Sequence, residues 1–135
     1  MIGRERLRLL GEWADRLAAP DFDFGHWVKS EQRADGAWSM PYFDFSTEAL
    51  EFLQAAPIEV FAWPDWMETE EAQRLLADHS AIAEATDDQL VKLMTALVRG
   101  DRFGEGTLAN SYDSGLLAAI AQRARVLGAV APHQE

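Results

Sequence analysis

The sequence predicts a mainly α protein: a compact bundle of about five helices with a short β-hairpin or extended aromatic segment near residues 24–45. Two observations lead to this fold class. Apolar side chains recur every three or four residues along most of the chain, which is the spacing of one helix face. Between residues 24 and 45, alternating aromatic residues and a turn signal replace that spacing.

The length favours a single domain over residues 1–135. Hydrophobic residues make up 48% of the chain, which is enough to build one core and too much for a disordered protein. We find no internal repeat, linker or low-complexity segment that would divide it.

The first predicted element is a helix over residues 4–18. Leu7, Leu10 and Leu17 share one face of it, and Pro20 follows its end.

The aromatic segment comes next. Ala34-Asp35-Gly36 signals a turn between two short strands, and Pro41 confines the second strand to an edge or an early end. Because an isolated hairpin is marginally stable in water, we expect this one to lie against the helices.

Cap residues predict where two helices in the middle of the chain begin. Ser46 is placed to cap a helix over 47–56, and Asp65 to cap one over 66–77. A short helical turn is expected near 81–85.

The clearest helix follows Thr86, because Thr86 and Gln89 form a capping-box pattern ahead of a broad apolar face. A final helix is predicted over about 114–127 from its apolar spacing, with Gly128 as its stop.

The net charge of −11 is concentrated in the middle of the chain. Residues 44–88 hold twelve acidic residues against Arg74 alone, which predicts an acidic central face. Such a face repels phosphate, so we expect no direct nucleic-acid binding. It can be solvated helix surface, attract a basic partner, or mimic a nucleic acid.

Residues 99–106 are the most polar junction between two helical patterns. Arg99 and Arg102 are spaced to hold one anion together, since guanidinium groups bind carboxylate or phosphate with two parallel hydrogen bonds. Asp101 and Glu105 can instead pair with those arginines and fasten the turn. The flanking sequence lacks the pattern of a phosphate-binding loop.

The sequence gives little support for a catalytic, metal or cofactor site. The chain has no cysteine, its histidines do not share a helix face, and no nucleophile-elbow motif occurs, so no catalytic residue, metal or cofactor is assigned. No apolar run reaches membrane-spanning length and the first residues do not resemble a signal peptide, so we expect a cytoplasmic protein without a membrane partner.

The stretch Leu97 to Phe103, with Glu105-Gly106 and Gly115-Leu116-Leu117, resembles a bacterial domain-of-unknown-function family (DUF6508-like). Residues 22–27, 40–43 and 63–66 are similar to the same family. The resemblance implies no substrate, cofactor or catalytic residue.

Three functional hypotheses remain open. The first is a non-enzymatic cytoplasmic interaction domain that meets a protein partner, or forms a homodimer, through the acidic central face or the junction. The second is a small-molecule anion binder or small enzyme that uses Arg99, Asp101, Arg102 and Glu105. The third is an acidic nucleic-acid mimic.

Overall fold

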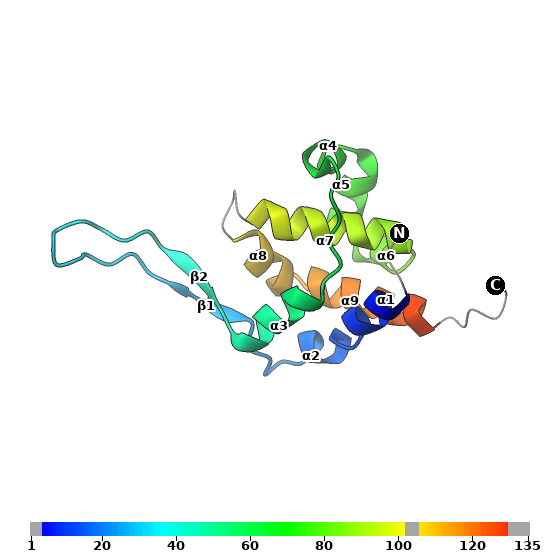
Figure 1. The fold of residues 1–135 in the computed structure, drawn as a ribbon, viewed down its shortest axis with the longest axis horizontal. Helices are drawn as coiled ribbons and strands as arrows, with labels where there is room; N and C mark the ends of the chain where they lie inside the picture. Colours follow the sequence, from blue (N-terminus) through cyan, green and yellow to red (C-terminus); the bar gives the residue numbers. More distant parts are fainter. Residues whose placement is uncertain (1–3, 102–105, 130–135) are drawn as a thin grey trace.

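A body of helices carries a two-stranded hairpin that projects from one end (Figure 1). The structure is a computed structural model, and it describes residues 4–101 and 106–129. The predicted fold class is confirmed, since the protein is mainly α with one short hairpin.

The N-terminal segment forms two helices, α1 (Arg4–Gly11) and α2 (Ala14–Ala18), where the sequence predicted one. Between them the side chain of Trp13 is buried and meets the ring of Phe52 edge-on at 5.7 Å. Both helices bury apolar residues, Leu7 and Leu10 in α1 and Ala14 and Leu17 in α2.

The hairpin consists of β1 (Gly25–Val28) and β2 (Tyr42–Phe45), paired antiparallel with Gly25 opposite Phe45. Near its tip, Gln32 and Trp38 form an isolated bridge in the same register. We call residues 25–45 the arm.

Helix α3 (Thr47–Ala55) begins where Ser46 predicts, because the Ser46 hydroxyl accepts a hydrogen bond of 3.0 Å from the backbone N–H of Ala49. The predicted helix over 66–77 is wrong in detail. The structure has α4 (Trp63–Met67) and α5 (Glu70–Ala77) in its place.

Thr69 causes this division of the predicted helix. Its hydroxyl accepts a hydrogen bond from Ala72 N–H and so caps α5, whereas the predicted cap Asp65 lies inside α4. Pro64 stands in the first turn of α4, where a missing backbone N–H costs nothing.

A short helix, α6 (His79–Ile82), precedes α7 (Asp87–Asp101). The capping box at the start of α7 is confirmed. Gln89 N–H donates to the hydroxyl of Thr86 at 3.1 Å, and the backbone N–H of Thr86 donates to the side-chain oxygen of Gln89 at 2.9 Å.

Two helices follow the junction: α8 (Thr107–Asp113), which the sequence reasoning missed, and α9 (Leu116–Ala129), close to the predicted 114–127. No helix among the described residues combines the length and apolar character needed to cross a membrane.

The core lies where α7 and α9 meet the N-terminal helices and α3 (Figure 1). Its largest fully buried side chains are Leu10, Phe52, Ile82, Leu90, Leu93, Met94, Thr95, Leu117 and Ile120.

Helix α1 packs closely along α9. A Cβ atom added to Gly11 would stand 2.5 Å from the Cα atom of Arg125, and one added to Gly128 would stand 3.2 Å from the backbone nitrogen of Arg8. The two glycines therefore allow the backbones to approach more closely than larger residues permit.

Thr95 is a buried polar residue of α7, and its hydroxyl is fully used. It donates to the carbonyl of Val91 at 2.7 Å and accepts from the backbone N–H of Glu59 at 3.1 Å. This bond fastens to α7 the extended segment between α3 and α4.

Candidate functional site

The polar junction predicted from the sequence falls at the end of α7. Asp101 is the last residue of that helix, and its carboxylate accepts a hydrogen bond of 3.0 Å from the backbone N–H of Leu108, near the start of α8. Asp101 therefore caps a helix that begins six residues later. Arg102 and Glu105 lie outside the described residues.

Arg99 is half-buried near the end of α7. The ion pairs between described Lys or Arg residues and described carboxylates lie elsewhere, and none involves Arg99. Since half of the predicted cluster is not described, the anion-binding hypothesis stays a prediction.

Two glycines of the junction face tryptophan side chains. A Cβ atom added to Gly100 would lie 3.8 Å from the ring of Trp63, and one added to Gly106 would lie only 3.3 Å from the ring of Trp27. Gly106 also has φ of +110°, a conformation that favours glycine. These observations give Gly106 a role in packing and backbone conformation that needs no ligand, whereas the space beside Gly100 would admit a methyl group.

The base of the arm is anchored to the body by aromatic rings. Phe24 stacks on Tyr112 of α8 with ring centroids 4.6 Å apart and rings nearly parallel, and it also contacts Phe43 and Phe45. The Tyr112 hydroxyl donates to the carbonyl of Phe22 at 3.2 Å. Burial is the main cause that raises the pKa of Tyr112, so its hydroxyl stays protonated as a donor.

The outer part of the arm does not lie against the helices, contrary to our expectation. Every residue from 29 to 38 is exposed, and Figure 1 shows the hairpin extending away from the body. The expected packing holds only at the base, where Phe24 stacks on Tyr112.

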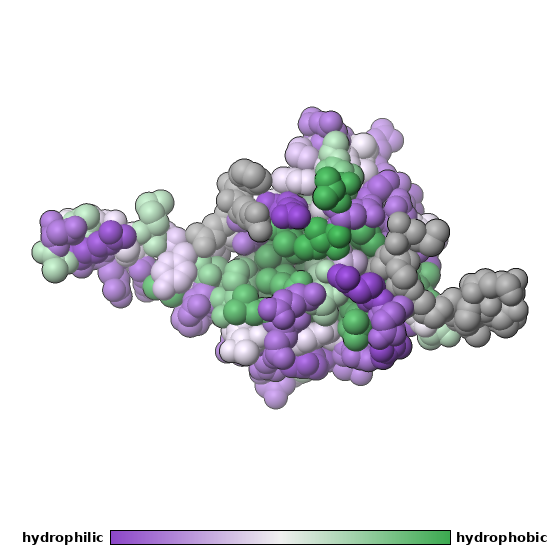
Figure 2. Space-filling model, viewed as in Figure 1, coloured by the Kyte–Doolittle hydropathy of each residue, from purple (hydrophilic) through white to green (hydrophobic). Residues whose placement is uncertain are grey.

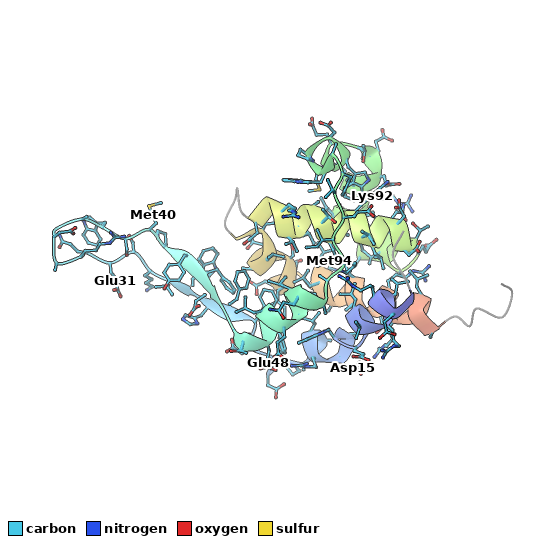
Figure 3. The ribbon with its side chains drawn as sticks, in the orientation of Figure 1. Asp15, Glu31, Met40, Glu48, Lys92 and Met94 are labelled. Atoms are coloured by element: carbon cyan, nitrogen blue, oxygen red, sulfur yellow. The ribbon has the colours of Figure 1, made fainter. Side chains whose placement is uncertain are left out.

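Large apolar side chains of the arm are left uncovered. The exposed fractions are 65% for Trp38, 80% for Met40 and 46% for Tyr42. Figure 3 shows Met40 and Glu31 pointing away from each other, and since alternate residues of a strand share a face, Trp38, Met40 and Tyr42 lie on the same face of the arm. The sequence carried a signal for this, since the facing strand offers only Ser30 and Gln32 opposite Met40 and Trp38.

The acidic stretch 44–88 does not form one face. In Figure 1, α3 lies on one side of α7, and α4 and α5 lie on the other. Figure 2 shows hydrophilic side chains over α4 and α5. We call the exposed acidic residues from α4 to the start of α7 the acidic flank: Asp65, Glu68, Glu70, Glu71, Asp78, Glu84 and Asp88.

Glu71 links three helices of this flank. Its carboxylate accepts hydrogen bonds from Trp66 Nε1 at 2.6 Å and from Gln89 Nε2 at 3.1 Å. Chiefly the bond from Trp66, then that from Gln89, lowers the pKa of Glu71 below its ordinary value. The side chain is therefore a structural anion.

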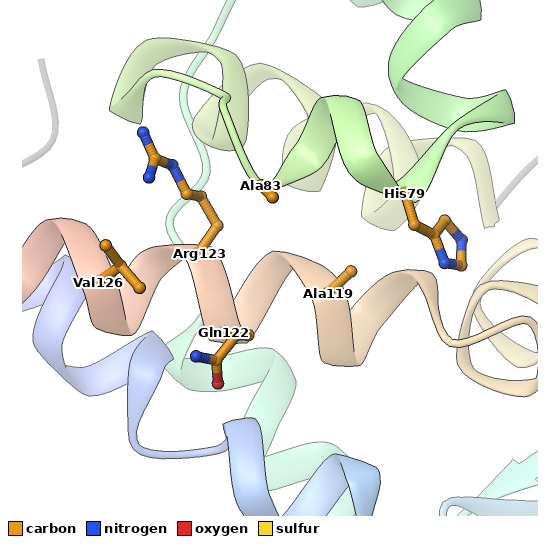
Figure 4. Close-up of a pocket in the computed structure, with 6 residues that line it drawn as sticks. All are labelled: His79, Ala83, Ala119, Gln122, Arg123 and Val126. Atoms are coloured by element: carbon orange, nitrogen blue, oxygen red, sulfur yellow. The ribbon is translucent and has the colours of Figure 1, made fainter.

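A groove lies between α6 and α9 (Figure 4). It holds about 270 Å³, and its residues are His79, Ala83, Ala119, Gln122, Arg123 and Val126. The Arg123 side chain donates to the carbonyl of Ala85 at 2.8 Å. The lining residues include no carboxylate or hydroxyl, so His79 has neither a nucleophile to activate nor a carboxylate to orient it there.

Within residues 4–101 and 106–129, no group of three or more His, Asp or Glu side chains is arranged to hold a metal ion. Comparison with known families gives one finding. Residues 2–129 match the model of a family described as "Family of unknown function (DUF6508)". The chain shows no significant match to a curated protein or to a solved structure.

Proposed function

Since this chain belongs to the DUF6508 family, whose function is unknown, we propose its role from its own geometry: it is a non-enzymatic interaction domain that binds a protein partner through the arm. The observation that carries the proposal is the apolar side of the arm, where Trp38, Met40 and Tyr42 stand exposed beyond the body. Contiguous apolar surface of this kind marks interaction sites in soluble proteins.

The way in which the arm is built supports the same role. Its base is fixed to the body by the stacked rings of Phe24 and Tyr112. Trp and Tyr side chains provide much contact area for little loss of conformational freedom, which suits them to a binding surface. The proposed setting is the cytoplasm, in keeping with a chain that has no cysteine for disulfide bonds.

The acidic central stretch, residues 44–88, adds a charge preference to this proposal. A partner that covers the acidic flank as well as the arm has to be basic where it meets the flank, because like charges would repel it. A partner that meets only the arm has no such requirement. The two cases differ in their response to salt, since screening weakens attraction between opposite charges.

Photo-crosslinking inside the source cells tests the proposal. A photoreactive phenylalanine analogue replaces Trp38 at the tip of the arm in the full chain. The matched control places the same analogue at Val60, a 97% exposed apolar residue of the body. We expect a discrete protein adduct from position 38 and none from position 60.

Two results would contradict the proposal. One is the absence of a protein adduct at position 38. The other is the same set of adducts from both positions, since that would show random collision instead of recognition by the arm.

A further inference from the structure

We propose that the occupant of the arm is the arm of a second copy of this chain, packed with its apolar side against the first. This inference rests on the proposed function, because it names the partner that the arm binds. Three observations support it: the incomplete sheet, the low net charge of the arm and the uncovered apolar area.

The arm is an incomplete sheet as it stands. Its sheet has two strands, and an isolated two-stranded hairpin is marginally stable in water without a further layer. The base receives that layer from Tyr112 and its neighbours, while residues 29–38 receive none. A second arm would supply the missing layer.

The low net charge of the arm allows the arm of a second copy to approach it. Within the arm, Lys29 and Arg33 stand against Glu31, Asp35 and Asp44, so its net charge is only −1. Nearly all of the net charge of −11 therefore belongs to the rest of the chain, which must repel another copy of itself. Because the arm projects from one end of the body, two copies can meet there while their acidic bodies stay apart (Figure 1).

The exposed apolar area of the arm sets the expected affinity of the dimer. Aromatic side chains each present ~150–250 Å² of surface. With the exposed fractions of Trp38, Met40 and Tyr42, two arms would bury about 800 Å² in total, in the range of weak and transient interfaces. The dimer should therefore form and dissociate with protein concentration.

Sedimentation velocity of the purified full chain tests this inference. We expect the weight-average sedimentation coefficient to rise with concentration, and to rise further between about 50 mM and about 500 mM salt, because screening reduces repulsion between the bodies. The double variant Trp38→Ser, Met40→Ser should raise the dissociation constant by more than about tenfold. Val60→Ser removes an apolar side chain of the body that is 97% exposed, more than either residue of the double variant, and should behave as the wild type.

Several results would overturn the inference. A wild-type protein that stays monomeric at both salt concentrations excludes self-association. A dimer that persists in the double variant, or weakens as salt rises, would use another surface. Circular dichroism confirms that the variants are folded.

If the double variant unfolds, the same photoreactive analogue is placed at position 40 of the full chain. Peptide mapping of its crosslinks then tests whether two arms meet. A crosslink to residues 26–45 of a second copy supports the inference, and one to the helices contradicts it. In each case a crosslink in cells from position 38 to a different protein would leave the proposed function intact, so the two failures are distinguishable.

Discussion

Gly11→Ala should destabilise the protein through the contact between α1 and α9. The new Cβ atom would stand 2.5 Å from the Cα atom, 2.7 Å from the backbone nitrogen and 2.9 Å from the Cβ atom of Arg125. Carbon atoms pack at ~3.5–4.0 Å, so the two helices have to separate by about 1 Å. Backbone atoms lie on both sides of this clash, and no side-chain rotation can relieve it.

The magnitude follows from two opposing terms. Overpacking costs ~1–3 kcal/mol, while replacing a helical glycine with alanine gains ~0.5–1 kcal/mol. The clash wins, and we expect the free energy of unfolding to fall by about 1–2 kcal/mol, with Tm lower by about 3–8 °C. Urea unfolding followed by circular dichroism measures the change.

Gly100→Ala is the matched control for this substitution. It also lies in a helix, but its added Cβ atom would meet only the ring of Trp63, at the ordinary distance of 3.8 Å. We expect it to leave the stability unchanged or raise it by up to ~1 kcal/mol. If Gly11→Ala unfolds at the same urea concentration as the wild type or at a higher one, the close approach of α1 and α9 is wrong.

Three further predictions concern single hydrogen-bonding groups. Thr95→Val leaves the N–H of Glu59 without its partner and should lower the free energy of unfolding, measured in urea, by ~1–3 kcal/mol. Thr95→Ser keeps the hydroxyl and should lower it less. Equal losses in the two variants would count against the hydrogen bond. Asp101→Ala removes the cap at Leu108 and should cost ~1 kcal/mol by thermal unfolding, while Asp101→Asn retains an acceptor oxygen and should lose less than half of that. For Glu71, the lowered pKa stabilises the fold above the ordinary glutamate value of 4.5, and this contribution is lost as pH falls through the folded-state pKa. The Tm of the wild type should therefore fall more steeply than that of Glu71→Gln as the pH is lowered below that value, and parallel curves would refute the assignment.

Features set by neighbouring residues could be predicted from the sequence. The start of α3 at Ser46 and the capping box of Thr86 with Gln89 depend on side chains within three residues of the backbone they bond. The apolar face of α7 is likewise a matter of spacing, and its residues from Leu90 to Leu97 are buried.

Features that depend on distant partners were missed. The break between α1 and α2 serves the packing of Trp13 against Phe52, far along the chain. The start of α8 depends on Asp101, which lies across the junction from the N–H group of Leu108 that it bonds. No pattern of neighbouring residues predicts either contact.

The candidate site was the part least accessible to sequence reasoning. The alternation around Trp38 and Met40 indicated a hairpin, but its projection depends on how much apolar surface the body leaves uncovered. The junction from Arg99 to Glu105 attracted attention because it is rich in charge, yet its described glycines face tryptophan rings and Asp101 caps a helix. Charge density alone therefore did not identify the site.

The pairing of α1 with α9 has a consequence for synthesis of the protein. Helix α1 leaves the ribosome long before α9, so α9 cannot cover Leu10 until α9 itself has been translated. Such a high separation along the chain slows folding and delays the final collapse until α9 has left the ribosome. Until then the leucines of α1 stay exposed, and exposed apolar surface promotes aggregation.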